Sequence, residues 1–312
     1  MNPRSPAASA TGPAPILLAY SDHRFEGVPS TDPLLLAESL RAFGGSLKDA
    51  PIWYLIRDDS TQGEALAMRA SALKLGIEVY KAEAGLEPWP FATKALAAAK
   101  AEEEAEGRAE LLAWFDRDSL VTGELSPLFL PPGKSLGYRP VNLRNIGSPA
   151  DSPPDPFWTR AISLSGIDPE ALGRTRAYIG GETLRFYIAA GLLVVRPEAG
   201  ILRAWAEHCR RFVSDPVLSA LARESPAGLI FLHQAALSLA AAALVPEESR
   251  FLLPDDLMYP LNLWSRDSPE RRPARIDALR SLRYDTMLED ESWRKLPISP
   301  SFAAWLQTMK GK

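Results

Sequence analysis

Histidine and cysteine are scarce in this chain of 312 residues, which has three histidines and one cysteine. A single cysteine, Cys209, cannot form a disulfide within the chain, and the sequence contains no Asn-x-Ser/Thr acceptor for N-glycosylation. Both absences favour a reducing compartment, so we expect a cytoplasmic protein. With only His23, His208 and His233 available, any metal or proton-transfer site must rely on carboxylates.

An excess of charge of either sign is also missing, because 35 Lys and Arg residues face 39 Asp and Glu residues, for a formal net charge of −4. Such a chain has no global basic field for a polyanion, and we expect no nucleic-acid partner. Apolar residues make up 46% of the chain and charged residues 24%, which are ordinary globular values. They permit a full hydrophobic core and exclude disorder of the whole chain.

Long hydrophobic runs are absent with one exception. Residues 1–14 are rich in Pro, Ala and Ser and lack the apolar stretch of a signal peptide, so we expect a flexible N-terminal tail. The uncharged stretch 225–246 approaches the roughly 20 residues that a membrane span needs. It is rich in alanine and carries His233, Gln234 and Ser238 near its middle. We therefore predict a buried helix and no stable membrane span.

The sequence does contain an alternation of short apolar runs with longer helical patterns, which is typical of an α/β sheet covered by helices. The first half of the chain predicts strands at 16–22, 51–59, 77–83 and 110–121, and helices at 32–45, 61–76 and 90–107. The carboxyl ends of parallel strands meet at the ligand crevice of such a sheet. We therefore expect the polar residues at 20–22, 57–59 and 116–118 to lie near one another.

A loop is predicted at residues 147–156, which contain four prolines. It separates a first half, 15–146, from a second half, 147–265, which has a different pattern with long helices at 201–214 and 228–244. We expect the remaining residues, 266–312, to form a C-terminal helical extension. Their arginine-rich start favours a solvated helix face over an anion site.

The most informative local pattern is Asp116-Arg117-Asp118, two carboxylates one residue apart after a hydrophobic strand. Alternation along an extended chain points both carboxylates to one side, where they repel each other unless a cation lies between them. Mg²⁺ or Mn²⁺ suits such oxygen ligands and can carry a phosphorylated ligand. The pattern fits a metal that bridges the diphosphate of a nucleotide sugar, or a phosphoryl-transfer site with Asp116 as the nucleophile. The ordinary alternative is a solvated strand end.

Four sequence blocks resemble, in the right order, the GT-A fold glycosyltransferases of the nucleotide-diphospho-sugar transferase superfamily, most nearly the glycogenin-like families. The blocks are 19–45, 91–98, 111–129 and 186–209, the last followed by HQAALSLA at 233–240. The resemblance implies an open mixed α/β sheet flanked by helices. It also implies a Rossmann-like N-terminal half at 15–146 that binds the nucleotide sugar, and an acceptor-side half of the same domain at 147–265.

The resemblance also assigns candidate site residues. Donor binding falls to Tyr20, Ser21, Asp22, Phe25, Lys94, Asp116, Arg117 and Asp118, with the turn after the first strand holding the nucleoside and Lys94 near the phosphates. Substrate contacts fall to Gly191, His233, Gln234, Tyr259 and Asn262. The metal ligands are expected to be Asp116, Asp118 and Asp285.

The sequence departs from the family's pattern at three places. Ala189 and Ala190 stand where an aromatic residue and an Asn are expected, and His233 stands where an Asp is common. The family's C-terminal metal-binding His has no counterpart here. We expect either that Asp285 supplies a third oxygen ligand, or that Arg283 replaces the charge of the cation on the diphosphate.

These observations predict a glycosyltransferase that moves a sugar from a nucleotide-diphosphate sugar, with a UDP-sugar as the expected donor, to an unknown acceptor. A divalent Mn²⁺ or Mg²⁺ ion at Asp116 and Asp118 would stabilise the leaving diphosphate. Two alternatives stay open. One is a GT-A-like protein that binds nucleotide sugars but has lost catalysis, as the departures suggest. The other is a haloacid-dehalogenase-like phosphatase with Asp116 as its nucleophile.

Overall fold

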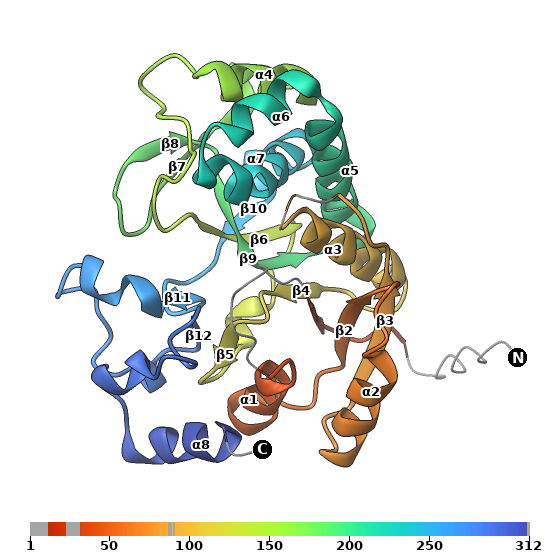
Figure 1. The fold of residues 1–312 in the computed structure, drawn as a ribbon, viewed down its shortest axis with the longest axis vertical. Coiled ribbons are helices and arrows are strands. Elements are labelled where there is room, and N and C mark those ends of the chain that lie inside the picture. The colour runs from red at the N-terminus through yellow and green to blue at the C-terminus, as the bar shows by residue number, and fades with distance from the viewer. Residues whose placement is uncertain (1–11, 23–31, 87–88, 90, 311–312) are drawn as a thin grey trace, which may run out of the picture.

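A seven-stranded mixed sheet runs through the centre of the molecule (Figure 1). The computed structural model describes residues 12–22, 32–86, 89 and 91–310. The strand order is β10-β6-β9-β4-β1-β2-β3, and all neighbours are parallel except β9, which is antiparallel to both β4 and β6. The bounds are β1 Leu17–Ser21, β2 Ile52–Arg57, β3 Ile77–Ala82, β4 Leu112–Phe115, β6 Leu136–Pro140, β9 Ile188–Val195 and β10 Arg250–Leu252. The predicted open α/β sheet is confirmed.

Helices cover both faces of this sheet. The helices are α1 Leu35–Phe43, α2 Gly63–Ala72, α3 Ala92–Ala105, α4 Pro156–Ser165, α5 Ile201–Ser214, α6 Pro216–Arg223, α7 Pro226–Leu244 and α8 Pro300–Lys310. Alternate residues of β1 enter two separate cores: Leu17 and Ala19 pack with α3, α5 and α7, whereas Leu18 and Tyr20 pack with α1 and α2. This division follows from the two-residue period of a strand. Figure 1 shows α3, α5 and α7 on one side of the sheet and α1 and α2 on the other.

The apolar stretch near 225–246 forms helix α7, as predicted. Its first turn is capped by Ser225, whose side chain accepts a hydrogen bond from the Gly228 N–H, and Pro226 occupies the first helical position. Within the described part of the chain, α7 is the one helix long and apolar enough to cross a membrane, and 61% of that stretch is buried inside the fold. Its apolar surface therefore packs largely against the rest of this chain.

The carboxylate pair lies in a turn, which differs from the single strand predicted at 110–121. The chain leaves β4 after Phe115, turns at 116–118, and continues as β5 Ser119–Val121 in a different sheet. That second sheet has the order β11-β12-β5, with β11 Tyr259–Pro260 and β12 Ser281–Arg283. The turn arises because the Asp116 N–H still bonds to the Gly191 carbonyl beside β4, while β5 pairs with β12.

The C-terminal segment 266–312 contains more than the expected helical extension. Besides α8 it carries β12, which pairs antiparallel with β5 so that Arg283 lies opposite Ser119. Strand pairing therefore brings this distant segment beside the carboxylate pair. A separate small hairpin, β7 Arg174–Arg176 and β8 Thr183–Arg185, follows the proline-rich loop.

Candidate functional site

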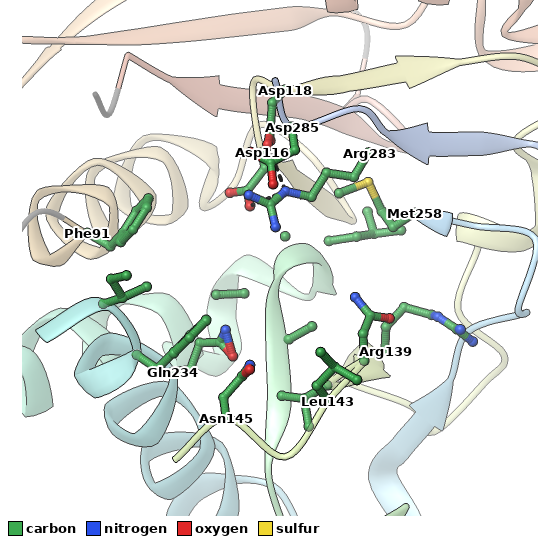
Figure 2. Close-up of a pocket in the computed structure, with 18 of the residues that line it drawn as sticks. Phe91, Asp116, Asp118, Arg139, Leu143, Asn145, Gln234, Met258, Arg283 and Asp285 are labelled. Carbon is green, nitrogen blue, oxygen red and sulfur yellow. Dashed lines mark hydrogen bonds and ion pairs between the residues drawn. The ribbon is translucent and has the colours of Figure 1, made fainter. Parts of the chain in front are cut away.

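A cavity of about 490 Å³ opens at one edge of the central sheet (Figure 2). Its walls come from the carboxyl ends of β4 and β6, the start of β9, the beginnings of α3 and α7, and the segment around β12. Because β9 runs antiparallel to both neighbours, β4 and β6 point the same way and their carboxyl ends meet at this edge. This is where ligands bind in open α/β sheets.

Asp116 is held inside the protein by a lysine. The Lys94 ammonium on α3 lies 2.6 Å from Asp116 Oδ1, and the two side chains are 3% and 7% exposed. Gly191 on β9 lies close to the same carboxylate, since a Cβ added there would stand 3.2 Å from Asp116 Oδ2. The absence of a side chain at this position therefore leaves room for the Asp116 carboxylate. The negative charge of Asp116 is already compensated within the fold.

Asp118 is paired with Arg283. The Arg283 Nε lies 2.8 Å from Asp118 Oδ2 and 4.0 Å from Asp116 Oδ2. The Asp118 carboxylate, ahead of those of Asp116 and Asp285, raises the pKa of Arg283 above its ordinary value. Figure 2 shows the guanidinium lying beside the two carboxylates. Arg283 therefore lies where the sequence places a metal ion.

Tyr20, Ser21 and Asp22, which are expected to hold the nucleoside, are not part of the lining of this cavity. Tyr20 is buried, and its hydroxyl donates to the Pro33 carbonyl. Ser21 and Asp22 line a smaller neighbouring hollow. Asp22 forms an ion pair with Arg117, which itself lines the main cavity. Phe25 lies outside the described residues.

Four of the five predicted substrate residues line the cavity: Gly191, His233, Gln234 and Asn262. Gln234 Oε1 is buried, and no described residue donates a hydrogen bond to it. The His233 ring bonds through Nδ1 to the Ile230 carbonyl. Tyr259 lies in the core instead, where its hydroxyl donates to Asp267 Oδ2 over 2.8 Å.

The sequence reasoning missed the wall formed by the end of β6. Arg139, Asn142 and Asn145 all line the cavity from this strand and the loop after it. Arg139 pairs with Asp255, and its guanidinium lies 4.8 Å from the Tyr178 ring centre. Strand β6 contains Gly137 and ends in a proline, so its pattern is weak. The available signal for this strand was the pair Leu136 and Tyr138, two large side chains separated by one small residue.

The residues around the turn do not fit the predicted metal ion. Within the described ranges, no group of three or more His, Cys, Asp or Glu side chains is placed to hold a metal. Asp116 and Asp118 face Lys94 and Arg283, and Asp285 Oδ2 accepts a hydrogen bond from Asn262. Asp118 Oδ1 is buried and has no hydrogen-bond partner among the described residues. Mn²⁺ and Mg²⁺ require several oxygen ligands, and here a divalent ion would also meet two protein cations.

Comparison with solved structures finds glycosyltransferases. The galactosyltransferase LgtC, in complex with donor and acceptor sugar analogues, is 13% identical, with 93% of this chain and 99% of LgtC covered and a TM-score of 0.47. Mouse xyloside xylosyltransferase 1 is 10% identical, with 88% and 98% covered and a TM-score of 0.42. The glycosyltransferase GlyE of Streptococcus pneumoniae is 12% identical, with 87% and 55% covered and a TM-score of 0.42. A comparison with curated proteins finds no match.

Comparison with models of protein families identifies a family for this chain. The model of the Rhodobacterales glycosyltransferase domain matches residues 29–245, which is more than half of the chain. The matched range includes the carboxylate turn, Lys94 and all of α7, and it ends before Arg283. The chain belongs to the Rhodobacterales glycosyltransferase domain family.

Proposed function

We propose that the cavity binds a nucleotide-diphosphate sugar, with UDP as the nucleotide, and that the protein transfers the sugar to an acceptor hydroxyl. The observation that carries this proposal is the charged wall of the cavity in a chain of a glycosyltransferase family. The cavity lining as a whole has four basic residues and three acidic ones, for a balance of +1: Lys94, Arg117, Arg139 and Arg283 against Asp116, Asp118 and Asp285. Such a wall can hold one diphosphate although the whole chain is acidic.

The transfer exchanges one bond at the anomeric carbon of the sugar. The bond between this carbon and the diphosphate oxygen breaks, and its electron pair leaves with the diphosphate. A bond to the acceptor oxygen forms, and the acceptor's proton passes to the diphosphate product or to water. The main electrostatic task is to stabilise the charge that develops on the leaving diphosphate. The predicted Mn²⁺ or Mg²⁺ ion is not part of this proposal, because the carboxylates are paired with Lys94 and Arg283.

The acceptor belongs at the opposite wall, where Arg139 is already paired with Asp255. The residues that line it from 140–145 and from the start of α7 include amides and apolar side chains but no Asp, Glu, Lys or Arg. Figure 2 shows Gln234, Asn145 and Leu143 on this side, across the cavity from Asp116 and Asp118. Amide groups both donate and accept hydrogen bonds, as sugar hydroxyls do. A neutral, hydroxyl-bearing acceptor therefore suits this wall.

The test is release of the nucleoside diphosphate from a panel of nucleotide sugars, with and without simple sugars as acceptors. We expect release from a UDP-sugar, and a loss of about 100-fold in Asp118→Asn because Arg283 loses its anchor. Asp151→Asn is the matched control, since Asp151 forms an exposed pair with Arg174 away from the cavity.

Two outcomes would contradict the proposal: no binding of any nucleotide sugar, or unchanged turnover in Asp118→Asn. Binding without transfer to any acceptor would favour the alternative of a protein that has lost catalysis. The phosphatase alternative gains no support, because the family match is to glycosyltransferases and Asp116 Oδ1 is occupied by Lys94.

A further inference from the structure

Arg283 offers unused hydrogen-bond donors to the cavity. Its Nε is engaged by Asp118, but its two terminal nitrogens form no hydrogen bond with any described residue. The side chain is 35% exposed and lines the cavity. A guanidinium presents its donors as a rigid planar fork that matches a phosphate. The two terminal nitrogens of Arg283 can therefore donate hydrogen bonds to an anionic ligand.

The fold holds this guanidinium in place before any ligand arrives. Arg283 is the last residue of β12, and β12 is paired on both sides, with β11 and with β5. The side chain is then anchored at Nε by Asp118, with Asp116 Oδ2 4.0 Å away. A guanidinium whose backbone and Nε are already held in place loses little conformational entropy when it binds a ligand.

Asp116 and Asp118 repel a diphosphate less at this position because each is already paired with a cation, whereas Asp285 accepts a hydrogen bond from the neutral Asn262 amide. Lys94 pairs with Asp116, and Arg283 itself pairs with Asp118. Asp118 Oδ1, buried and without a partner among the described residues, can accept a hydrogen bond from a donor hydroxyl. The pair of carboxylates therefore positions two cations, and a metal ion is not required to neutralise it.

We propose that Arg283 binds the diphosphate of the donor in place of a divalent metal, so that the protein binds its donor without metal. This inference rests on the proposed function, since it names the group that holds the proposed donor. During transfer the same guanidinium would stabilise the charge on the leaving diphosphate. Asp118 acts through Arg283 as a positioning residue.

The first experiment is calorimetric titration of UDP into the full chain, in excess EDTA and again with Mn²⁺. We expect the two dissociation constants to agree within about threefold. Arg283→Ala should weaken UDP binding roughly 10- to 100-fold in both buffers, because a charged bidentate contact is lost. Arg283→Lys should recover only part of this affinity, because it keeps the charge without the fork.

Arg280→Ala is the matched control for these variants. Arg280 lies three residues earlier and also pairs with an aspartate, Asp256, but it does not line the cavity. We expect its UDP affinity to equal that of the wild type, and thermal unfolding of every variant will show whether it folds. UDP binding that requires Mn²⁺, or unchanged UDP affinity in Arg283→Ala, would overturn the inference.

A second measurement separates this inference from the proposed donor. Free Mn²⁺ is followed by its paramagnetic resonance signal as the protein is added, with and without UDP. We expect the wild type to leave the signal unchanged and Arg283→His to reduce it, because an imidazole beside Asp116 and Asp118 completes a metal site. If no nucleoside diphosphate binds the wild type, the proposed function and this inference both fail. If UDP binds, Mn²⁺ that is bound by the wild type and lost in Asp118→Asn overturns this inference alone, and unbound Mn²⁺ supports it.

Discussion

At the scale of single residues, the site is governed by two ion pairs with different surroundings. Lys94 and Asp116 are both buried and form an ion pair 2.6 Å long in the interior. Arg283 and Asp118 lie at the cavity wall, where the terminal nitrogens of Arg283 can donate hydrogen bonds to a ligand. Both pairs line the cavity, but the first is buried whereas the Arg283 side chain of the second is 35% exposed. The two pairs should therefore respond differently to substitution.

Lys94→Met tests the buried pair. Removing the ammonium takes away the 2.6 Å partner of a buried carboxylate, and we expect a loss of about 3 to 5 kcal/mol in the free energy of unfolding. Urea denaturation followed by circular dichroism measures it. The double variant Lys94→Met/Asp116→Asn should regain part of the loss, because the stranded charge is gone.

Lys100→Met is the control on the same helix. The Lys100 side chain is 34% exposed and pairs with Glu103 and Glu104 at the surface, where such pairs contribute roughly 0 to 1 kcal/mol. Equal losses of unfolding free energy in Lys94→Met and Lys100→Met would show that the buried pair stabilises the fold no more than the surface pairs do.

At the scale of elements, helices α3 and α5 are joined by a buried carboxylate. Glu102 on α3 is fully buried and accepts hydrogen bonds from the Leu202 and Arg203 N–H groups, 3.1 and 2.8 Å away. These are free donors of the first turn of α5, whose N-cap is Gly200 and has no capping side chain. Glu102 therefore caps a helix that lies about 100 residues further along the chain.

This cap predicts a pH dependence of stability. Burial raises the pKa of Glu102 from 4.5 to about 7, against the opposing effect of the backbone donors. A carboxyl group whose pKa is raised by folding stabilises the fold fully below the unfolded pKa and loses this contribution as pH rises through the folded pKa. We expect the stability of the wild type relative to Glu102→Gln to fall by about 3 kcal/mol between pH 4.5 and 7.

Urea denaturation at several pH values measures this difference. Glu106→Gln, on the same helix and in contact with the same Arg203 at the surface, is the control and should change little with pH. A difference between the wild type and Glu102→Gln that is flat across this range would contradict the expected titration.

At the scale of the whole molecule, the cavity depends on a separate small core beneath the C-terminal segment. Leu120 of β5, Tyr259 of β11 and Leu282 of β12 pack together there with residues from 288–306. The strand that carries Arg283 is thus fixed by a different core from the one behind α7. Loss of packing in this small core should disturb donor binding more than an equal loss elsewhere.

Leu282→Ala and Leu218→Ala compare the two cores. Both side chains are fully buried. Leu282 belongs to β12 and Leu218 to α6, and each truncation should lower the free energy of unfolding by about 2 to 5 kcal/mol. We expect only Leu282→Ala to weaken UDP binding, by about 10-fold or more at a temperature where both variants are folded, because it loosens the strand that holds Arg283. Calorimetry measures the affinity, and equal affinities in the two variants would contradict the coupling.

Local pattern was sufficient to predict much of the fold. The first three strands and the helices between them were predicted with boundaries a few residues too wide, because alternation and caps are local signals. The burial of α7 was also predicted, since a helix that is apolar on every side has to pack inside. Strand β6 and the cavity wall after it were missed, because a short strand with a glycine and a proline carries little signal.

The alternating α/β architecture, with Asp116 and Asp118 at the end of an apolar strand, can be predicted from local sequence patterns. The charges that these carboxylates meet depend on contacts between distant segments. Pairing of β5 with β12 turns the chain at 116–118 and brings in Arg283, which is 165 residues from Asp118 in the sequence. The physical reason is that a carboxylate's role depends on the nearest opposite charge. That neighbour is chosen here by strand pairing and by the packing of α3, neither of which the local sequence around the turn encodes.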